Sequence, residues 1–247
     1  MKKKILIVGD SYASPSGGYQ NWPKRAFPDW KSYENIALGG TSFWRTVDNL
    51  HYVNNWNKFR HCIVFWSEHM RIYVRSTNSF IGGNDTRLNK AFRDPSPWSG
   101  LTKGKHIFNT PIDKSRLVQK NVARSYELGI MEREFENLKA YSCLQSFYNV
   151  FYKKYPKVNF INIHCFNWLE DVAENFNVDV NFKSSENVIH VDGNMFRDCS
   201  SRNEELNNRN HMTDEQHTKF AKFISQIIDR LDNGDEITTN PDLRKIK

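Results

Sequence analysis

The sequence predicts an α/β fold in which helices cover both faces of a parallel sheet. Short apolar segments of strand length alternate along the chain with segments whose apolar residues recur at helical spacing, which is the pattern of β-α-β units. The first apolar segment, Lys3 to Val8, is aliphatic and β-branched, as in a strand buried in the middle of such a sheet. With 247 residues, of which 38% are apolar, the chain is long enough to bury a sizeable core.

The first half of the chain contains three segments of strand character. The first strand ends at a turn at Gly9, and residues 12–33 are rich in Gly, Pro, Ser and Trp, which predicts an irregular or partly helical crossover. A second short strand is expected at 33–37. A helix capped by its first Thr or Ser is expected at about 41–56, and the apolar run HCIVFW predicts a third strand at 61–66.

A long irregular insertion is expected before the next helices. Residues from about 76 to 111 contain several glycines and prolines and show little periodicity, and loops of this length are commonly functional. At 115–154 apolar residues recur at helical spacing, which indicates one long or two consecutive amphipathic helices that end before Pro156. Alternation predicts a fourth strand at 158–166, and residues 188–191 are expected to form a short fifth strand or part of a loop.

The last helix is expected to begin after Thr213 and to run to about Leu231. Thr213 and Gln216 match a capping box, in which each of the two side chains bonds the other residue's backbone N–H group. We interpret residues 1–232 as a single domain. The polar residues 233–247 are expected to form a disordered tail.

Composition excludes several classes of protein and site. No apolar segment near the start is long enough for a membrane span or a secretory signal peptide, so we expect a cytoplasmic protein with no membrane partner. The four cysteines are scattered, which argues against a zinc knuckle or a disulfide framework, and no metal or cofactor is expected. The net charge of +7 is compatible with nucleic acid, but the basic residues are dispersed and do not indicate it.

Ser11 and His211 are candidates for the central pair of a serine hydrolase. The first strand ends in Gly9-Asp10-Ser11, which places Ser11 at the carboxyl edge of the sheet, where open α/β folds bind ligands. A serine needs a base to remove its proton, and His211, just before the last helix, is the best candidate to return to that edge. We interpret Asp10 as a residue that stabilises the turn.

The order of three short motifs resembles that of the SGNH (GDSL-like) hydrolase family. Residues 5–11 (ILIVGDS) match its first block, residues 35–41 (NIALGGT) match its second, and His211 with the helix behind it matches its last. The resemblance implies a flavodoxin-like three-layer α/β/α sandwich with serine esterase or acyl hydrolase activity. It also implies that Ser11 is the nucleophile, that His211 is its base, and that the backbone N–H groups of Ser11 and Gly40 stabilise the oxyanion.

The catalytic acid of the family has no charged counterpart at its usual position. That position lies three residues before the histidine and is occupied by Asn208, which accepts a hydrogen bond but does not stabilise a charged imidazole. Three acids in the preceding segment are substitutes: Asp192, Asp198 and Glu205. A Ser–His dyad is a further alternative.

The third block of the family, a Gly-x-Asn-Asp turn after the third strand, is also altered. The expected third strand ends in Trp66-Ser67, so Ser67 is one candidate for a side-chain donor to the oxyanion. The sequence GGND occurs at 82–85, inside the insertion, and makes Asn84 the other candidate, although this sequence also suits an ordinary turn. Removing one oxyanion donor typically costs about 100- to 1,000-fold in turnover.

The expected substrate is a small-molecule or glycan ester. The many aromatic residues at 12–33 are of the kind that stacks on sugar rings, which is a hint of a carbohydrate or nucleotide-like ligand. Two alternatives to hydrolysis stay open. One is an SGNH-like binding or structural module that has lost hydrolysis and contacts a polyanion through its basic surface, and the other is acyl transfer by the same Ser-His pair. The sequence assigns no oligomeric state.

Overall fold

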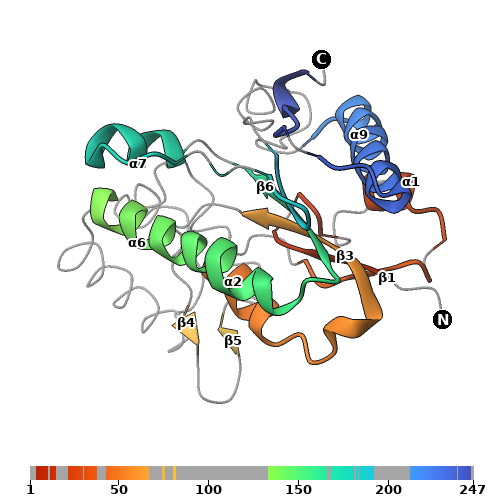
Figure 1. The fold of residues 1–247 in the computed structure, drawn as a ribbon, viewed down its shortest axis with the longest axis horizontal. Coiled ribbons are helices and arrows are strands. Elements are labelled where there is room, and N and C mark those ends of the chain that lie inside the picture. The colour runs from red at the N-terminus through yellow and green to blue at the C-terminus, as the bar shows by residue number, and fades with distance from the viewer. Residues whose placement is uncertain are drawn as a thin grey trace, which may run out of the picture.

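A parallel five-stranded sheet forms the centre of the computed structural model, with the strand order β2-β1-β3-β6-β7 (Figure 1). The strands are β1 (Lys4–Val8), β2 (Tyr33–Asn35), β3 (Phe59–Trp66), β6 (Asn159–His164) and β7 (Val188–Val191). Each neighbouring pair is parallel. The chain extends the sheet from β1 to β2 on one side and then through β3 to β7 on the other. This is the strand order of flavodoxin-like folds, and it confirms the predicted fold class.

The structure describes residues 4–10, 12–14, 22–29, 31–37, 43–66, 74–75, 80–81, 133–165, 168–180, 182, 184–191, 212–237 and 239–245. Within the expected insertion, it describes only β5 (Phe80–Ile81), which pairs antiparallel with β4 (Val74–Arg75). The rest of the insertion lies outside the described residues. No helix in the described part of the chain is long and apolar enough to span a membrane.

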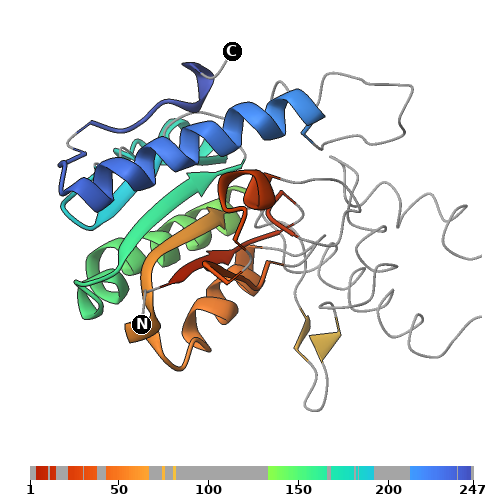
Figure 2. The same ribbon diagram turned by 90° about the vertical axis from the view of Figure 1, so that its right-hand side faces the viewer.

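Helices cover both faces of the sheet and produce three layers (Figures 1 and 2). One face, called the α9 face below, is covered by α1 (Trp22–Ala26) and α9 (Asp214–Asn233). The other, called the α6 face, is covered by α2 (Phe43–His51), α6 (Arg133–Ser146) and α7 (Trp168–Phe176). α6 continues without a break through a π-helical turn (Phe147–Phe151) and a 3-10 turn (Tyr152–Lys154).

The strands are apolar on both sides because both faces are covered. Successive side chains of a strand point to opposite faces. Ile5 and Ile7 of β1 accordingly pack on the α9 face, whereas Leu6 and Val8 pack on the α6 face. Full burial of one such side chain contributes about 1.5–3 kcal/mol to folding.

α9 begins at the predicted residue. Thr213 Oγ1 accepts a hydrogen bond from the Gln216 N–H at 3.2 Å, and Gln216 Oε1 accepts one from the Thr213 N–H at 2.7 Å, so the predicted capping box is confirmed. The helix extends two residues beyond the expected Leu231 and ends at Asn233. Gly234 follows with a φ of 80°, the left-handed conformation that glycine adopts at helix ends.

The segment after α9 is not the expected disordered tail. Ile237 and Leu243 are buried on the α9 face, and Leu243 begins a short 3-10 helix (Leu243–Lys245). The side chain of Asn240 accepts hydrogen bonds from the Ser184 N–H and hydroxyl and donates to the Phe182 carbonyl at 2.8 Å. Two isolated apolar residues in a polar segment produce no periodic pattern, which is why composition predicted disorder.

Four other differences from the expected elements concern helix and strand boundaries. The strand expected at 158–166 is the shorter β6, Asn159–His164. The helix expected at 41–56 ends at His51, and Trp56 begins a separate 3-10 turn (Trp56–Lys58). β2 is two residues shorter than expected and β3 two residues longer, and the segment at 188–191 is a strand. α7 was not expected at all.

Candidate active site

The expected site is at the carboxyl edge of the sheet, beside β1 and β3. The sheet grows in one direction from β1 to β2 and in the other from β1 to β3. Such a reversal is the point where open α/β sheets bind ligands. In Figure 2 the strand arrowheads and the start of α9 lie on the same side of the molecule, so α9 begins at this edge.

The residues predicted to take part in the chemistry lie outside the described residues. These are Ser11, Gly40, Ser67, Asn84, Asn208 and His211, together with the alternative acids Asp192, Asp198 and Glu205. The structure does describe their neighbours in the chain. These neighbours are Asp10 and Tyr12 around Ser11, Ala37 near Gly40, Trp66 before Ser67, and Met212 after His211. The geometry of the candidate site is therefore built from the backbone and side chains that flank the predicted groups.

Gly9 brings the end of β1 close to β3. Its φ is +149°, a backbone conformation that residues with a side chain rarely adopt. A Cβ atom at this position would lie 2.5 Å from the Cβ of Phe65. Real Cβ atoms do not approach so closely, so only glycine fits between the two strands. The glycine of the Gly9-Asp10-Ser11 motif thus has a packing role at the start of the turn.

Asp10 organises the turn that follows β1. Its side chain is fully buried, and its Oδ1 accepts a hydrogen bond from the Tyr12 N–H at 3.1 Å. Its backbone carbonyl accepts bonds from the N–H groups of Ala13 and Ser14 at 3.1 and 2.9 Å. This is an Asx-type turn closed on one residue, and it agrees with the interpretation of Asp10 as a stabilising residue.

Asn35, at the end of β2, ties this turn to the second motif. Its Nδ2 donates to the Ala13 carbonyl at 2.7 Å, and its Oδ1 accepts from the Ala37 N–H at 3.0 Å. One half-buried amide therefore holds both the turn after β1 and the chain leading to Gly39-Gly40. Sequence reasoning placed Asn35 in the second block but gave it no role, because the contact with Ala13 spans 22 residues.

Trp22, the first residue of α1, is attached to the same turn. Its indole Nε1–H donates to the Tyr12 carbonyl at 2.9 Å. The indole is fully buried and packs against Phe65 of β3 and Phe220 of α9, with ring centroids 5.6 and 5.0 Å apart. A single side chain thus contacts the turn, the sheet and the last helix.

The start of α9 is bound to α1. The Trp22 N–H donates to His217 Nδ1 at 3.3 Å, and Arg25 binds the side chains of Asp214 and Thr218. His217 is therefore half-buried and hydrogen-bonded. These contacts fix the first turns of α9, and Met212 just before them is buried in the same apolar cluster as Tyr12.

The end of β3 is held from the α6 face. The Trp66 Nε1–H donates to the side-chain oxygen of Asn162 at 2.9 Å, and the Tyr152 hydroxyl donates to the same oxygen at 2.5 Å. The Trp66 carbonyl accepts a bond from the Cys165 N–H at 3.0 Å. This buried network ends one residue before Ser67.

Two buried histidines lie at the carboxyl edge on the α6 face. The ring centroids of His164 and His190 are 4.7 Å apart, and His190 Nδ1 is 3.1 Å from the Tyr148 hydroxyl. Within the described part of the chain, neither ring nitrogen of His164 has a hydrogen-bond partner. Burial, with a smaller effect of His190, lowers the pKa of His164 well below its usual value, so its ring is neutral. His164 is thus a buried residue at the end of β6.

Three of the four described aromatic residues in the segment that hints at a sugar ligand are core residues. Tyr12, Trp22 and Phe27 are 3%, 0% and 8% exposed and belong to the α9-face cluster. A ring without exposed surface offers no platform for a ligand. These three residues therefore carry no indication of a carbohydrate substrate.

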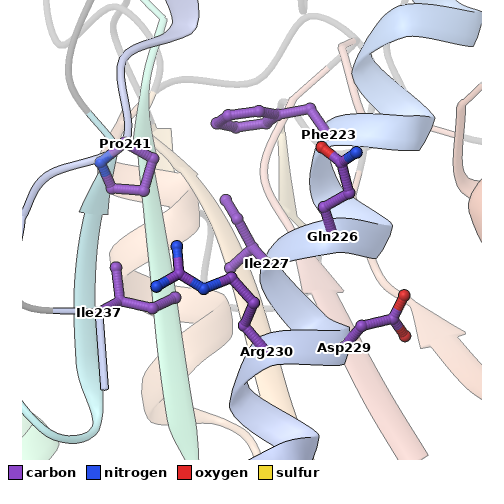
Figure 3. A pocket seen from close by; sticks show the side chains of 7 residues that line it. All are labelled: Phe223, Gln226, Ile227, Asp229, Arg230, Ile237 and Pro241. Carbon is purple, nitrogen blue, oxygen red and sulfur yellow. The ribbon is translucent and has the colours of Figure 1, made fainter. Parts of the chain in front are cut away.

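Two grooves formed by described residues lie away from the carboxyl edge. One of about 420 Å³, between α9 and the chain after it (Figure 3), is lined by Phe223, Gln226, Ile227, Asp229, Arg230, Ile237 and Pro241. Another of about 230 Å³, near the amino ends of β3 and β6, is lined by Trp56, Asn57, Phe59, Lys154, Tyr155, Pro156, Lys157 and Val158. Among the described residues, no group of three or more His, Cys, Asp or Glu side chains is arranged to hold a metal.

Comparisons of the chain with protein-family models, with curated proteins and with solved structures found no match. The functional interpretation therefore rests on the motifs and the geometry of this chain.

Proposed function

We propose that the protein is a serine esterase or acyl hydrolase of the SGNH type that acts on an O-acyl ester of a small molecule or glycan. One observation carries the proposal: Trp22 hydrogen-bonds both to Tyr12, which follows Ser11, and to His217, in the first turns of the helix that follows His211. The support is thus a common location, at the carboxyl edge, for the two chain segments that carry the nucleophile and the base.

In the proposed reaction His211 accepts the proton of the Ser11 hydroxyl while the Ser11 oxygen attacks the acyl carbon. The N–H groups of Ser11 and Gly40, with a side-chain donor from Ser67 or Asn84, stabilise the oxyanion. His211 then gives the proton to the departing alcohol, which leaves an acyl-serine. Water attacks this ester while His211 takes a proton from the water, and His211 then gives that proton to the Ser11 oxygen as the carboxylic acid departs.

The turn geometry around Ser11 supports this role. Gly9 and Asp10 produce a tight turn directly after a buried strand, and Asn35 links that turn to the segment before Gly40. Both proposed backbone donors are thus carried by segments that one amide connects. An oxyanion site needs donors that are held in place before the charge develops.

A fluorophosphonate probe tests the proposal without knowledge of the substrate, because it reacts with activated serines. Intact mass should show one adduct per chain, absent in Ser11→Ala and reduced to background in His211→Ala. Ser142→Ala is the matched control, because Ser142 is an exposed serine on α6 that donates only to the Leu138 carbonyl in its own helix. An adduct that persists in Ser11→Ala, or no adduct on folded protein, contradicts the proposal.

A module without hydrolytic activity is the second candidate, favoured by Asn208 at the position of the family's acid. The substitution Asn208→Asp distinguishes this module from an active hydrolase. If Asn208 lies behind His211, a carboxylate there should raise the labelling rate of Ser11 by about tenfold or more, because it stabilises the charged imidazole. Folded protein that is unlabelled with either residue at this position favours the binding module.

Acyl transfer uses the same two residues and differs only in the acceptor. Once an acyl-serine is detected, adding an alcohol or a sugar to the reaction separates the two activities, because a transferase forms a new ester in proportion to the acceptor. The cytoplasmic location and the absence of a cofactor remain predictions.

A further inference from the structure

We infer that Trp22 is a positioning residue that holds the turn carrying Ser11 and the start of α9 at a fixed separation. The inference rests on the proposed Ser11–His211 reaction and adds a residue that no motif identifies. Trp22 hydrogen-bonds to both segments, through its side chain to the turn and through its backbone to α9.

The bond to the turn acts on the residue next to the nucleophile. The indole Nε1–H donates to the carbonyl of Tyr12 at 2.9 Å, and both side chains are buried. Water does not replace this donor readily at such a site, so its loss leaves a buried carbonyl without that partner. The peptide between Tyr12 and Ala13 would then lose a restraint, and the turn that carries Ser11 would be held less firmly.

The bond to α9 acts six residues after the proposed base. The Trp22 N–H donates to His217 Nδ1 at 3.3 Å, and Arg25, one turn along α1, binds Asp214 and Thr218. The indole also packs edge-on against Phe220 at 5.0 Å between centroids. α1 is therefore attached to the first turns of α9 at several points, and a shift of α1 moves both segments.

Proton transfer between a serine and a histidine requires a separation near 3 Å, and a displacement of about 1 Å can cost about 100-fold in rate. A residue bonded to both supporting segments controls that separation directly. Asn35 differs in this respect, because its bonds join the turn to the chain after β2 and do not involve α9.

The test replaces the indole donor but keeps an aromatic ring. Trp22→Phe removes the bond to Tyr12 while a ring remains between Phe65 and Phe220. Tyr141→Phe is the control, because it also removes a hydroxyl donor from a buried ring, to the Asp179 carbonyl, at a site on the α6 face. Both variants are expected to lose similar thermal stability.

The two variants should differ in the kinetics of fluorophosphonate labelling. For Trp22→Phe we expect the maximal labelling rate constant to fall about 10- to 100-fold, with one adduct per chain still reached at completion. For Tyr141→Phe the rate constant should stay within about twofold of the parent, since no bond to the turn or to the end of β3 is lost.

Each outcome distinguishes the inference from the proposed function. A parent protein that is folded but unlabelled overturns the proposed function itself. A labelled parent with an unchanged rate constant in Trp22→Phe overturns the positioning role, and so does a reduced labelled fraction that reacts at the parent rate, which is the result of misfolding. If Trp22→Phe does not fold, His217→Ala removes the acceptor on α9 from a half-buried site, and an unchanged rate constant there overturns the inference.

Discussion

Asp232, in the last turn of α9, accepts a hydrogen bond from the buried ring of His61 in β3, with 2.8 Å between Asp232 Oδ1 and His61 Nε2. The other ring nitrogen, Nδ1, is 3.3 Å from the side-chain nitrogen of Asn159. Because an amide nitrogen only donates, Nδ1 accepts and Nε2 carries the proton. Neutral His61 is thus satisfied on both sides. The contact anchors the end of α9 at the edge of the sheet opposite the candidate site.

Removal of Asp232 should therefore destabilise the fold. Asp232→Ala leaves the buried Nε2–H of His61 without this acceptor, and we expect a loss of about 1–3 kcal/mol in the free energy of unfolding at pH 7. Urea denaturation measures this loss in the free energy of unfolding. Glu215→Ala, which removes an exposed carboxylate paired with Lys219, is the control and should leave stability unchanged. Equal losses of stability in the two variants would show that the bond between Asp232 and buried His61 does not stabilise the fold.

Stability should fall as the pH is lowered below about 6.5, the ordinary pKa of histidine. Burial lowers the pKa of His164 in the folded protein, and burial also lowers that of His61, although Asp232 opposes the change. The unfolded chain then binds more protons than the folded chain, so folding is favoured above pH 6.5 and weakens as the pH falls toward the lowered values.

His164→Phe tests which histidine dominates this pH dependence. The replacement keeps a ring beside Phe182 but removes the titrating group, so the decrease in urea midpoint between pH 8 and pH 5 should become smaller. His51→Phe changes an exposed histidine and should leave the decrease as steep as in the parent. A decrease of parental steepness in His164→Phe would assign it to other groups.

A methyl group at Gly9 should be among the most damaging small changes to this fold. Gly9→Ala combines an unfavourable φ of +149° with a 2.5 Å contact to Phe65, and we expect a loss of about 3 kcal/mol or more. Gly234→Ala is the matched control, since its φ is +80° but no atom lies within 4 Å of the added methyl group, and it should cost about 1 kcal/mol. Similar midpoints for both variants in urea would mean that β1 and β3 separate easily.

Local signals explain what could be predicted from the sequence. The capping box of α9 lies within four residues, and β1 and β3 each contain a continuous apolar run, so these elements follow from the sequence. The parallel sheet then followed from the alternation of strands and helices. α7 has nine residues, as many as α2, and was not predicted although its apolar residues Leu169, Val172 and Phe176 recur at helical spacing.

The contacts that shape the candidate site are not local. Trp22 and His217 are 195 residues apart, and Asn35 and Ala13 are 22 residues apart. A tryptophan in an irregular segment and an asparagine at the end of a strand show no pattern that reveals such bonds. The motifs therefore predict where the chemistry is carried, but not which residues support it. Tyr12 and Trp22 are buried and give no support to the prediction of a sugar ligand.

Asn35 provides a direct test of that support. In Asn35→Ala both bonds of the amide are lost, so the turn after β1 and the chain leading to Gly40 are no longer linked. We expect the rate of fluorophosphonate labelling to fall about 10- to 100-fold, because two oxyanion donors lose their fixed geometry. Asn187→Ala is the control, since Asn187 is also half-buried and donates to a backbone carbonyl, that of Val158, at the opposite edge of the sheet. Comparable stability of the two variants with slow labelling in Asn35→Ala alone supports a role at the site, whereas equal labelling rates would restrict Asn35 to folding.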